Sequence, residues 1–101
     1  IGYPDYALDC FERALTQYSL NFKYYKNLAN TYKMLGQVDN KIKLYLSKKN
    51  PLSKVMLGLL YEAKGDKKRA ITILDDFTMS EPDLIITPAV KQHIKEIVDG
   101  V

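Results

Sequence analysis

The chain has 101 residues, of which 47% are hydrophobic, and a formal net charge of +3 at pH 7. This length gives a single domain with enough apolar side chains for a core, and every apolar run is far shorter than the roughly 20 residues of a membrane span. Cys10 is the only cysteine, which excludes an internal disulfide and a multi-cysteine metal site and fits a reducing compartment. We therefore expect an intracellular protein, cytoplasmic or nuclear, without a metal or cofactor.

Apolar residues recur at spacings of three and four through successive segments, as they do along one face of an amphipathic helix. Gly36 and Gly65 each follow such a segment and are expected to end a helix, because glycine adopts the left-handed conformation at little cost. The pattern predicts helices over residues 5–18, 22–35, 38–48, 52–64 and 67–79.

A sixth helix is expected to begin at Thr87 and Pro88, with the threonine as N-cap and the proline in the first turn. Polar residues flank its apolar stripe, as in a helix that covers the end of a stack and faces water. The predicted stripe consists of Val90, Ile94, Ile97 and Val98.

The glycines also mark an internal repeat. Gly2, Gly36 and Gly65 precede similar stretches, at intervals of 34 and 29 residues. Two further stretches agree with each other: Tyr25-x2-Leu28-Ala29-x2-Tyr32 and Leu57-Gly58-x2-Tyr61. This pattern resembles the first helix of the tetratricopeptide repeat, with Tyr25 in the place of the usual tryptophan and Lys54 where the second copy should be aromatic. Second-helix positions match at Ala7, Phe11, Ala14 and Leu15, and again at Ala70, Leu74, Phe77 and Pro82.

The resemblance implies an all-α fold, a right-handed α-solenoid of antiparallel helix hairpins with about two and a half repeats and a C-terminal capping helix. A single domain, 1–101, would then comprise the second helix of a truncated repeat (1–21), a short repeat (22–50), a repeat (51–84) and the capping helix (85–101). Since the chain begins at the turn of a repeat, we expect a piece of a larger tetratricopeptide-repeat protein with an open N-terminal end.

The middle repeat departs from the pattern. It is five residues short, and it carries Lys41 and Lys48 where the pattern has small residues. Small residues let paired helices approach closely, so the two helices of this repeat are expected to splay.

Charge is concentrated in one band. Residues 22–54 contain eight lysines against Asp39, a net charge of +7. In tetratricopeptide arrays the first helix of each hairpin lines a concave groove, so the resemblance places part of this band there. Ammonium groups beside amides suit an acidic peptide or a C-terminal carboxylate. The expected partner-binding residues are Lys23, Lys26, Asn27, Asn30 and Lys33.

The family's carboxylate clamp, which holds the acidic C-terminus of heat-shock chaperones, is only partly matched. Lys26 and Asn30 fit its opening Lys-x3-Asn element, but Met56 occupies the position of the next asparagine. The Lys-x3-Arg element is also absent, although Lys91 and Lys95 are four residues apart. A solvated lysine-rich face that binds nothing is the plain alternative.

No catalytic constellation is evident. His93 is expected to be exposed on the capping helix and without a role, because no ligand-forming residues stand at the required spacing around it. Cys10 is interpreted as a small core residue, and the side chains of Asp75 and Asp76 diverge around their helix. We therefore do not expect an enzyme.

The sequence thus predicts a protein–protein interaction scaffold or adaptor that binds a peptide or partner subunit within a larger complex. A structural homo-oligomerisation unit that associates through the open N-terminal end is the first alternative. Nucleic-acid binding through the lysine-rich segment is less favoured, because arginine, which leads in contacts to bases, is scarce.

Overall fold

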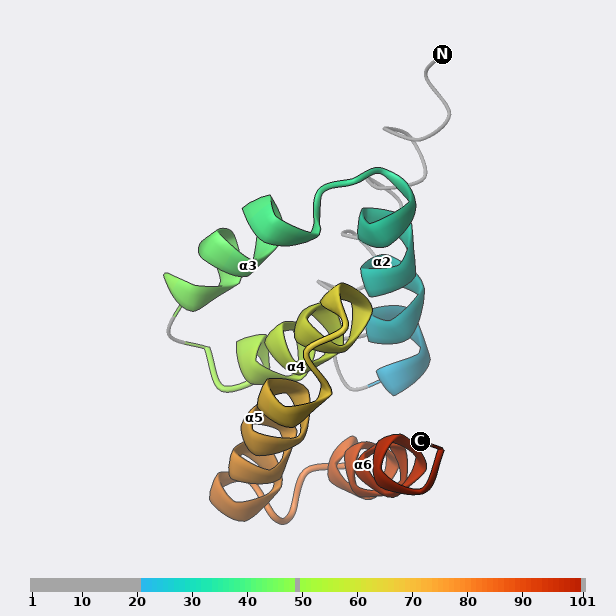
Figure 1. Cartoon of the computed structure of the whole chain (residues 1–101). Coiled ribbons are helices and arrows are strands. Elements are labelled where there is room, and N and C mark those ends of the chain that lie inside the picture. Colours follow the sequence, from blue (N-terminus) through green and yellow to red (C-terminus); the bar gives the residue numbers. More distant parts are fainter. Residues whose placement is uncertain (1–20, 49, 101) are drawn as a thin grey trace.

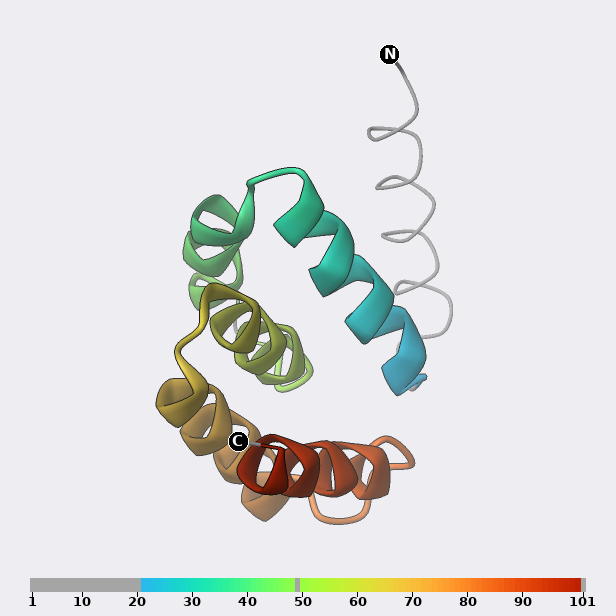
Figure 2. The same cartoon turned by 45° about the vertical axis from the view of Figure 1, so that its right-hand side comes forward.

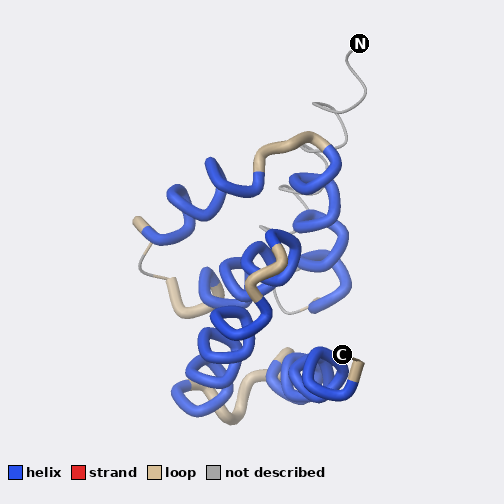
Figure 3. The backbone as a smooth tube through the Cα atoms, viewed as in Figure 1, coloured by secondary structure: helices blue, strands red, loops and turns tan. Residues whose placement is uncertain are grey.

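The computed structural model describes residues 21–48 and 50–100. These residues form helices without any strand, as predicted (Figures 1 and 3). The helix expected over 5–18, Cys10 and the open N-terminal end lie outside this part of the chain. None of the helices described is long and apolar enough to cross a membrane. The helices are α2 (Phe22–Met34), α3 (Val38–Leu46), α4 (Ser53–Lys64), α5 (Lys67–Ser80) and α6 (Thr87–Asp99).

Short capping motifs set most of the helix boundaries. The Asn21 side chain accepts a hydrogen bond from the backbone N–H of Lys23 and so caps the start of α2. Gly36 and Gly65 have φ angles of 69° and 97°, the left-handed conformation expected of residues that follow a helix. Asp66, directly after Gly65, accepts from the N–H of Arg69 and caps α5. The positions of Gly36 and Gly65 therefore predicted these helix ends correctly.

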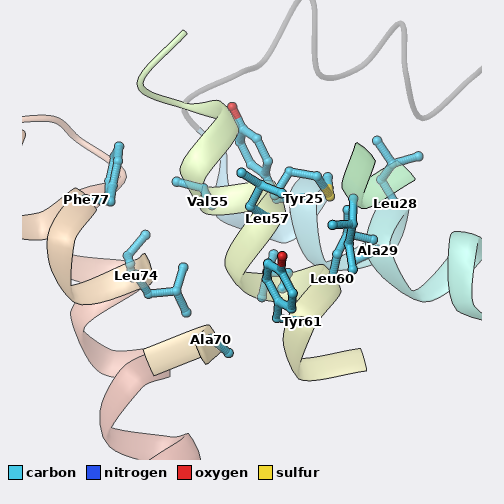
Figure 4. Close-up of a cluster of buried hydrophobic side chains, with 14 of the residues drawn as sticks. Tyr25, Leu28, Ala29, Val55, Leu57, Leu60, Tyr61, Ala70, Leu74 and Phe77 are labelled. Carbon is cyan, nitrogen blue, oxygen red and sulfur yellow. The ribbon is translucent and has the colours of Figure 1, made fainter. Parts of the chain in front are cut away.

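The core surrounds α4, whose face is buried along nearly its whole length (Figure 4). Leu28 and Ala29 of α2 pack against one side, and Leu74 and Phe77 of α5 pack against the other. α4 and α5 approach closely at Gly58, where a Cβ atom would come within 2.5 Å of Leu74 Cδ2. Gly58 is thus a contact residue, at the small-residue position of the repeat.

α3 is the least regular element. It ends at Leu46, short of the predicted residue 48, and Leu46 is 59% exposed. α3 packs more extensively on α4 than on its hairpin partner α2, so the first pair of helices splays as expected (Figure 2). An ion pair of 2.8 Å between Lys64 and Asp39 joins the end of α4 to the start of α3.

The start of α6 differs from the prediction. Thr87 is not the N-cap but the first residue of the helix, and its buried hydroxyl donates a hydrogen bond to the carbonyl of Glu81. Pro88 lies in the first turn, as expected. The apolar stripe is also rotated, because Val98 is 53% exposed while His93 is buried. Through this hydrogen bond Thr87 ties the start of α6 to the residue that follows α5.

Candidate functional site

The polar residues expected to bind a partner all lie on α2. The buried stripe of this helix faces α4, and the 3.6-residue period turns the residues between the buried positions toward the space beside α6. Four of the five expected residues are exposed, and Asn27 is half-buried. In Figure 2, α2 and α6 lie on two sides of α4, so this face looks across toward the capping helix.

A central hollow of about 360 Å³ lies between α2, α4 and α6. Its α2 wall carries most of the expected residues, and its floor is formed by α4. Its lining residues are Lys26, Asn27, Ala29, Asn30 and Lys33 of α2, Leu59, Glu62 and Ala63 of α4, and His93 of α6.

An end hollow of about 800 Å³ adjoins it near the start of α2. Lys26 and Asn27 border both hollows, and Lys23 is found in the end hollow alone. The structure therefore brings all five expected residues to the walls of two hollows that share Lys26 and Asn27, and together these hollows form the groove. The end hollow is lined by Asn21, Phe22, Lys23, Lys26, Asn27, Ile85, Ile86 and Ala89.

The lysines of this groove are not paired with acidic side chains in the part of the chain that the structure describes. Lys23, Lys26 and Lys33 form no ion pair with any residue of 21–48 or 50–100. Other lysines nearby are engaged elsewhere: Lys54 pairs with Asp76 at 2.6 Å. Within the groove, the lysine charge therefore lies on the α2 wall.

Two cations outside the groove are held by acidic or aromatic groups. The hydrogen bond and the charge of Lys64 hold the pKa of Asp39 below its ordinary value, and the same contact raises the pKa of Lys64. The ammonium group of Lys48 lies 5.1 Å from the centre of the Tyr45 ring, a cation–π contact. Neither lysine lines the two hollows of the groove.

His93 was assigned wrongly from the sequence. It is only 8% exposed, and its Nε2 donates a hydrogen bond of 2.6 Å to Glu62 Oε1. Its ring lies 5.3 Å from the ring of Phe22, and Nδ1 has no hydrogen-bond partner in the described chain, with Glu96 Oε1 3.6 Å away. His93 thus joins the capping helix to α4 and α2 at the floor of the central hollow.

The position of His93 could have been found from spacing. It stands three residues after Val90 and four before Ile97, so it shares a helical face with both. The predicted apolar stripe of α6 runs through Ile94 and Val98 instead, because the His93 ring is polar. Glu62 gave no comparable signal, because its role depends on which face of α4 meets α6.

The arrangement differs from a carboxylate clamp. Met56, at the position of the clamp's second asparagine, is fully buried in the core. Lys91 and Lys95 are exposed but do not line either hollow. Only the opening pair, Lys26 and Asn30, borders the groove.

The described residues hold no group of three or more His, Cys, Asp or Glu side chains placed to bind a metal ion. Asp75 and Asp76 are both exposed, and Asp76 is engaged with Lys54. The groove instead offers ammonium groups, amides and one His–Glu pair. Such a surface can bind an acidic or amide-rich ligand by charge and hydrogen bonding.

A family model described as tetratricopeptide repeat matches residues 10–43. The described part of this match contains α2 and the first residues of α3, and so includes the whole α2 wall of the groove. No curated protein and no solved structure gives a significant match.

Proposed function

Because the chain carries a tetratricopeptide repeat at residues 10–43, a motif that mediates protein–protein interaction, we propose that it is a scaffold or adaptor that binds a partner through its concave groove. The observation that supports this most strongly is the groove itself. Two adjoining hollows are lined by amides and by lysines that form no ion pair with any described residue, all of them on α2. The partner is a peptide or protein segment within a larger complex.

Each groove residue has a distinct role in this proposal. The ammonium groups of Lys23, Lys26 and Lys33 bind carboxylates of the partner. The side-chain amides of Asn27 and Asn30 bind its backbone, since an amide both donates and accepts hydrogen bonds. An acidic segment in an extended conformation satisfies both sets of groups. The single cysteine favours a cytoplasmic or nuclear location for this complex.

The proposal is tested by capture of a partner from cell lysate. The wild-type chain is compared with the triple variant Lys23→Glu, Lys26→Glu and Lys33→Glu. Because these residues are exposed on the groove wall, the variant should fold normally and lose the partner. Circular dichroism checks that the helix content is unchanged.

A matched control keeps the total change in charge the same. Lys67, Lys68 and Lys91 are also exposed, but they line neither hollow. Glutamate at these three positions should leave capture intact. If the groove variant and the control variant retain the same partner equally, the groove is not the binding site.

Self-assembly and nucleic-acid binding remain the alternatives. A strict monomer in light scattering at high concentration would exclude the first. Absence of salt-sensitive retention of RNA or DNA in filter binding would exclude the second.

A further inference from the structure

The two hollows of the groove have unlike walls. The central hollow is bordered by Lys26, Asn30 and Lys33, with polar groups of Glu62 and His93 at its floor. Opposite the lysines, the end hollow has a wall of purely apolar side chains, formed by Ile85, Ile86 and Ala89, with Phe22 at its α2 side.

Ile85 is the most informative residue of this apolar wall. It is 77% exposed, whereas its neighbour Ile86 is buried in the core. A single exposed aliphatic residue is ordinary on a protein surface. Ile85, however, lines a concavity together with Phe22 and Lys23, which is the mixture of apolar surface and a few polar groups found in binding pockets.

The dimensions of the groove limit the ligand. Lys23 and Lys33 are ten residues apart on one helix, which corresponds to about 15 Å along its axis. An extended chain covers this distance in about four to five residues. The end hollow and the central hollow are displaced along α2 by about half of that length, or roughly two to three extended residues.

Glu62 restricts where acidic groups can bind. Its half-buried carboxylate lies at the floor of the central hollow and is hydrogen-bonded to His93 at 2.6 Å. A ligand carboxylate at the floor would be repelled, since like charges in a partly enclosed site interact unfavourably. Ligand carboxylates must therefore bind at the rim, at Lys26 and Lys33.

We propose that the groove binds an extended acidic peptide segment that carries a large aliphatic side chain two to three residues from its carboxylates. The aliphatic group occupies the end hollow against Ile85 and Phe22, and the acidic residues lie along Lys26 and Lys33. This inference rests on the proposed function, and it adds the apolar anchor and its spacing from the acidic residues.

The test begins with a phage-displayed library of random peptides selected on the wild-type chain. The inference predicts enrichment of sequences that combine Asp or Glu with Leu, Ile or Met at the stated spacing. Enriched peptides without an aliphatic residue would overturn the inference but leave the peptide-binding function standing. If no peptide of any composition is enriched, both proposals fail.

An enriched peptide is then synthesised with a fluorescent label, and its affinity is measured by anisotropy. Replacement of its aliphatic residue by Ser should weaken binding by about ten-fold, the effect of removing a partly buried aliphatic side chain. The protein variant Ile85→Ser should bind the original peptide about ten-fold more weakly as well. In this variant, replacing the peptide's aliphatic residue by Ser should cause no further loss of affinity. Equal and independent effects of the two changes would show that the residues do not meet, and would overturn the inference.

Met79→Ser is the matched control, since Met79 is 75% exposed on α5 and lines neither hollow. It should leave the affinity unchanged, and a loss equal to that of Ile85→Ser would count against the proposed site. Two other occupants would also overturn the inference. One is a second copy of the chain, shown by a dimer that Ile85→Ser dissociates. The other is single-stranded RNA, shown if RNA binds the wild-type chain, loses affinity on Ile85→Ser, and binds more tightly than the enriched peptide.

Discussion

Gly58→Ala is expected to destabilise the fold, although alanine favours helix formation. Gly58 lies in the middle of α4, and an added methyl would fall on the side chain of Leu74, within 2.5 Å of its Cδ2 and closer still to Cγ. Cγ is a branch point that moves only when the whole Leu74 side chain moves. We therefore expect a cost at the upper end of core overpacking, about 3 kcal/mol.

The helix propensity of alanine offsets about 1 kcal/mol of this, which leaves a net loss of about 2 kcal/mol. Urea unfolding followed by far-UV circular dichroism measures the loss as a lower midpoint at unchanged slope. Ala63→Gly, in the last turn of the same helix, should cost at most about 1 kcal/mol, mainly through the loss of helix propensity.

A double-mutant cycle isolates the contact between α4 and α5. Leu74 is fully buried, and Leu74→Ala should cost about 3 kcal/mol on its own. In Gly58→Ala/Leu74→Ala the clash is absent, so the pair should cost about 2 kcal/mol, well below the sum of the single losses. Stabilisation by Gly58→Ala alone, or strict additivity in the cycle, would show that the two helices do not approach at this point.

Three further perturbations test other parts of the structure. Burial raises the pKa of Tyr25 to about 12, with Tyr45 contributing, so between pH 10 and 12 the folded state keeps a proton that the unfolded chain has lost. The free energy of unfolding should therefore fall by about 1.4 kcal/mol per pH unit in this range. Tyr25→Phe should flatten that slope in urea unfolding. Gly65→Ala should cost about 1 kcal/mol in thermal unfolding, since Gly65 has a φ of 97°, and no change would contradict the left-handed turn. His93→Ala should cost about 2 kcal/mol through loss of the charged hydrogen bond to Glu62, and Glu62→Ala should then add little in the same background.

Helix positions were predictable from the sequence because local signals fix them. Gly65 and Asp66 act on the backbone within a few residues, and the ends of α4 and α5 fell within a residue of the prediction. The end of α3 was less predictable. No glycine follows Leu46, and the chain leaves the helix through residues that carry no strong stop signal.

The groove was only half predictable. The α2 wall follows from the period of one helix, so Lys26 and Asn30 could be assigned together. The opposite wall depends on how α6 folds back after Thr87, and that path is set by contacts between distant residues. Ile85 and His93 were therefore missed as groove residues, because nothing in their local sequence shows that they share a hollow with α2.

The charge of the lysine-rich segment has a different meaning once the contacts are known. A net charge of +7 over residues 22–54 is, by itself, typical of a surface that binds a long polyanion. Lys54, however, is paired with Asp76, and Lys48 lies over Tyr45, both at a separate hollow on another side of α4. The lysines that face the groove span only about 15 Å and stand opposite an apolar wall and a carboxylate. A nucleic-acid backbone would gain nothing from that wall and would be repelled by Glu62. The proposed acidic segment suits the groove better, because it can hold its carboxylates at Lys26 and Lys33, away from Glu62, and place one aliphatic side chain against the wall.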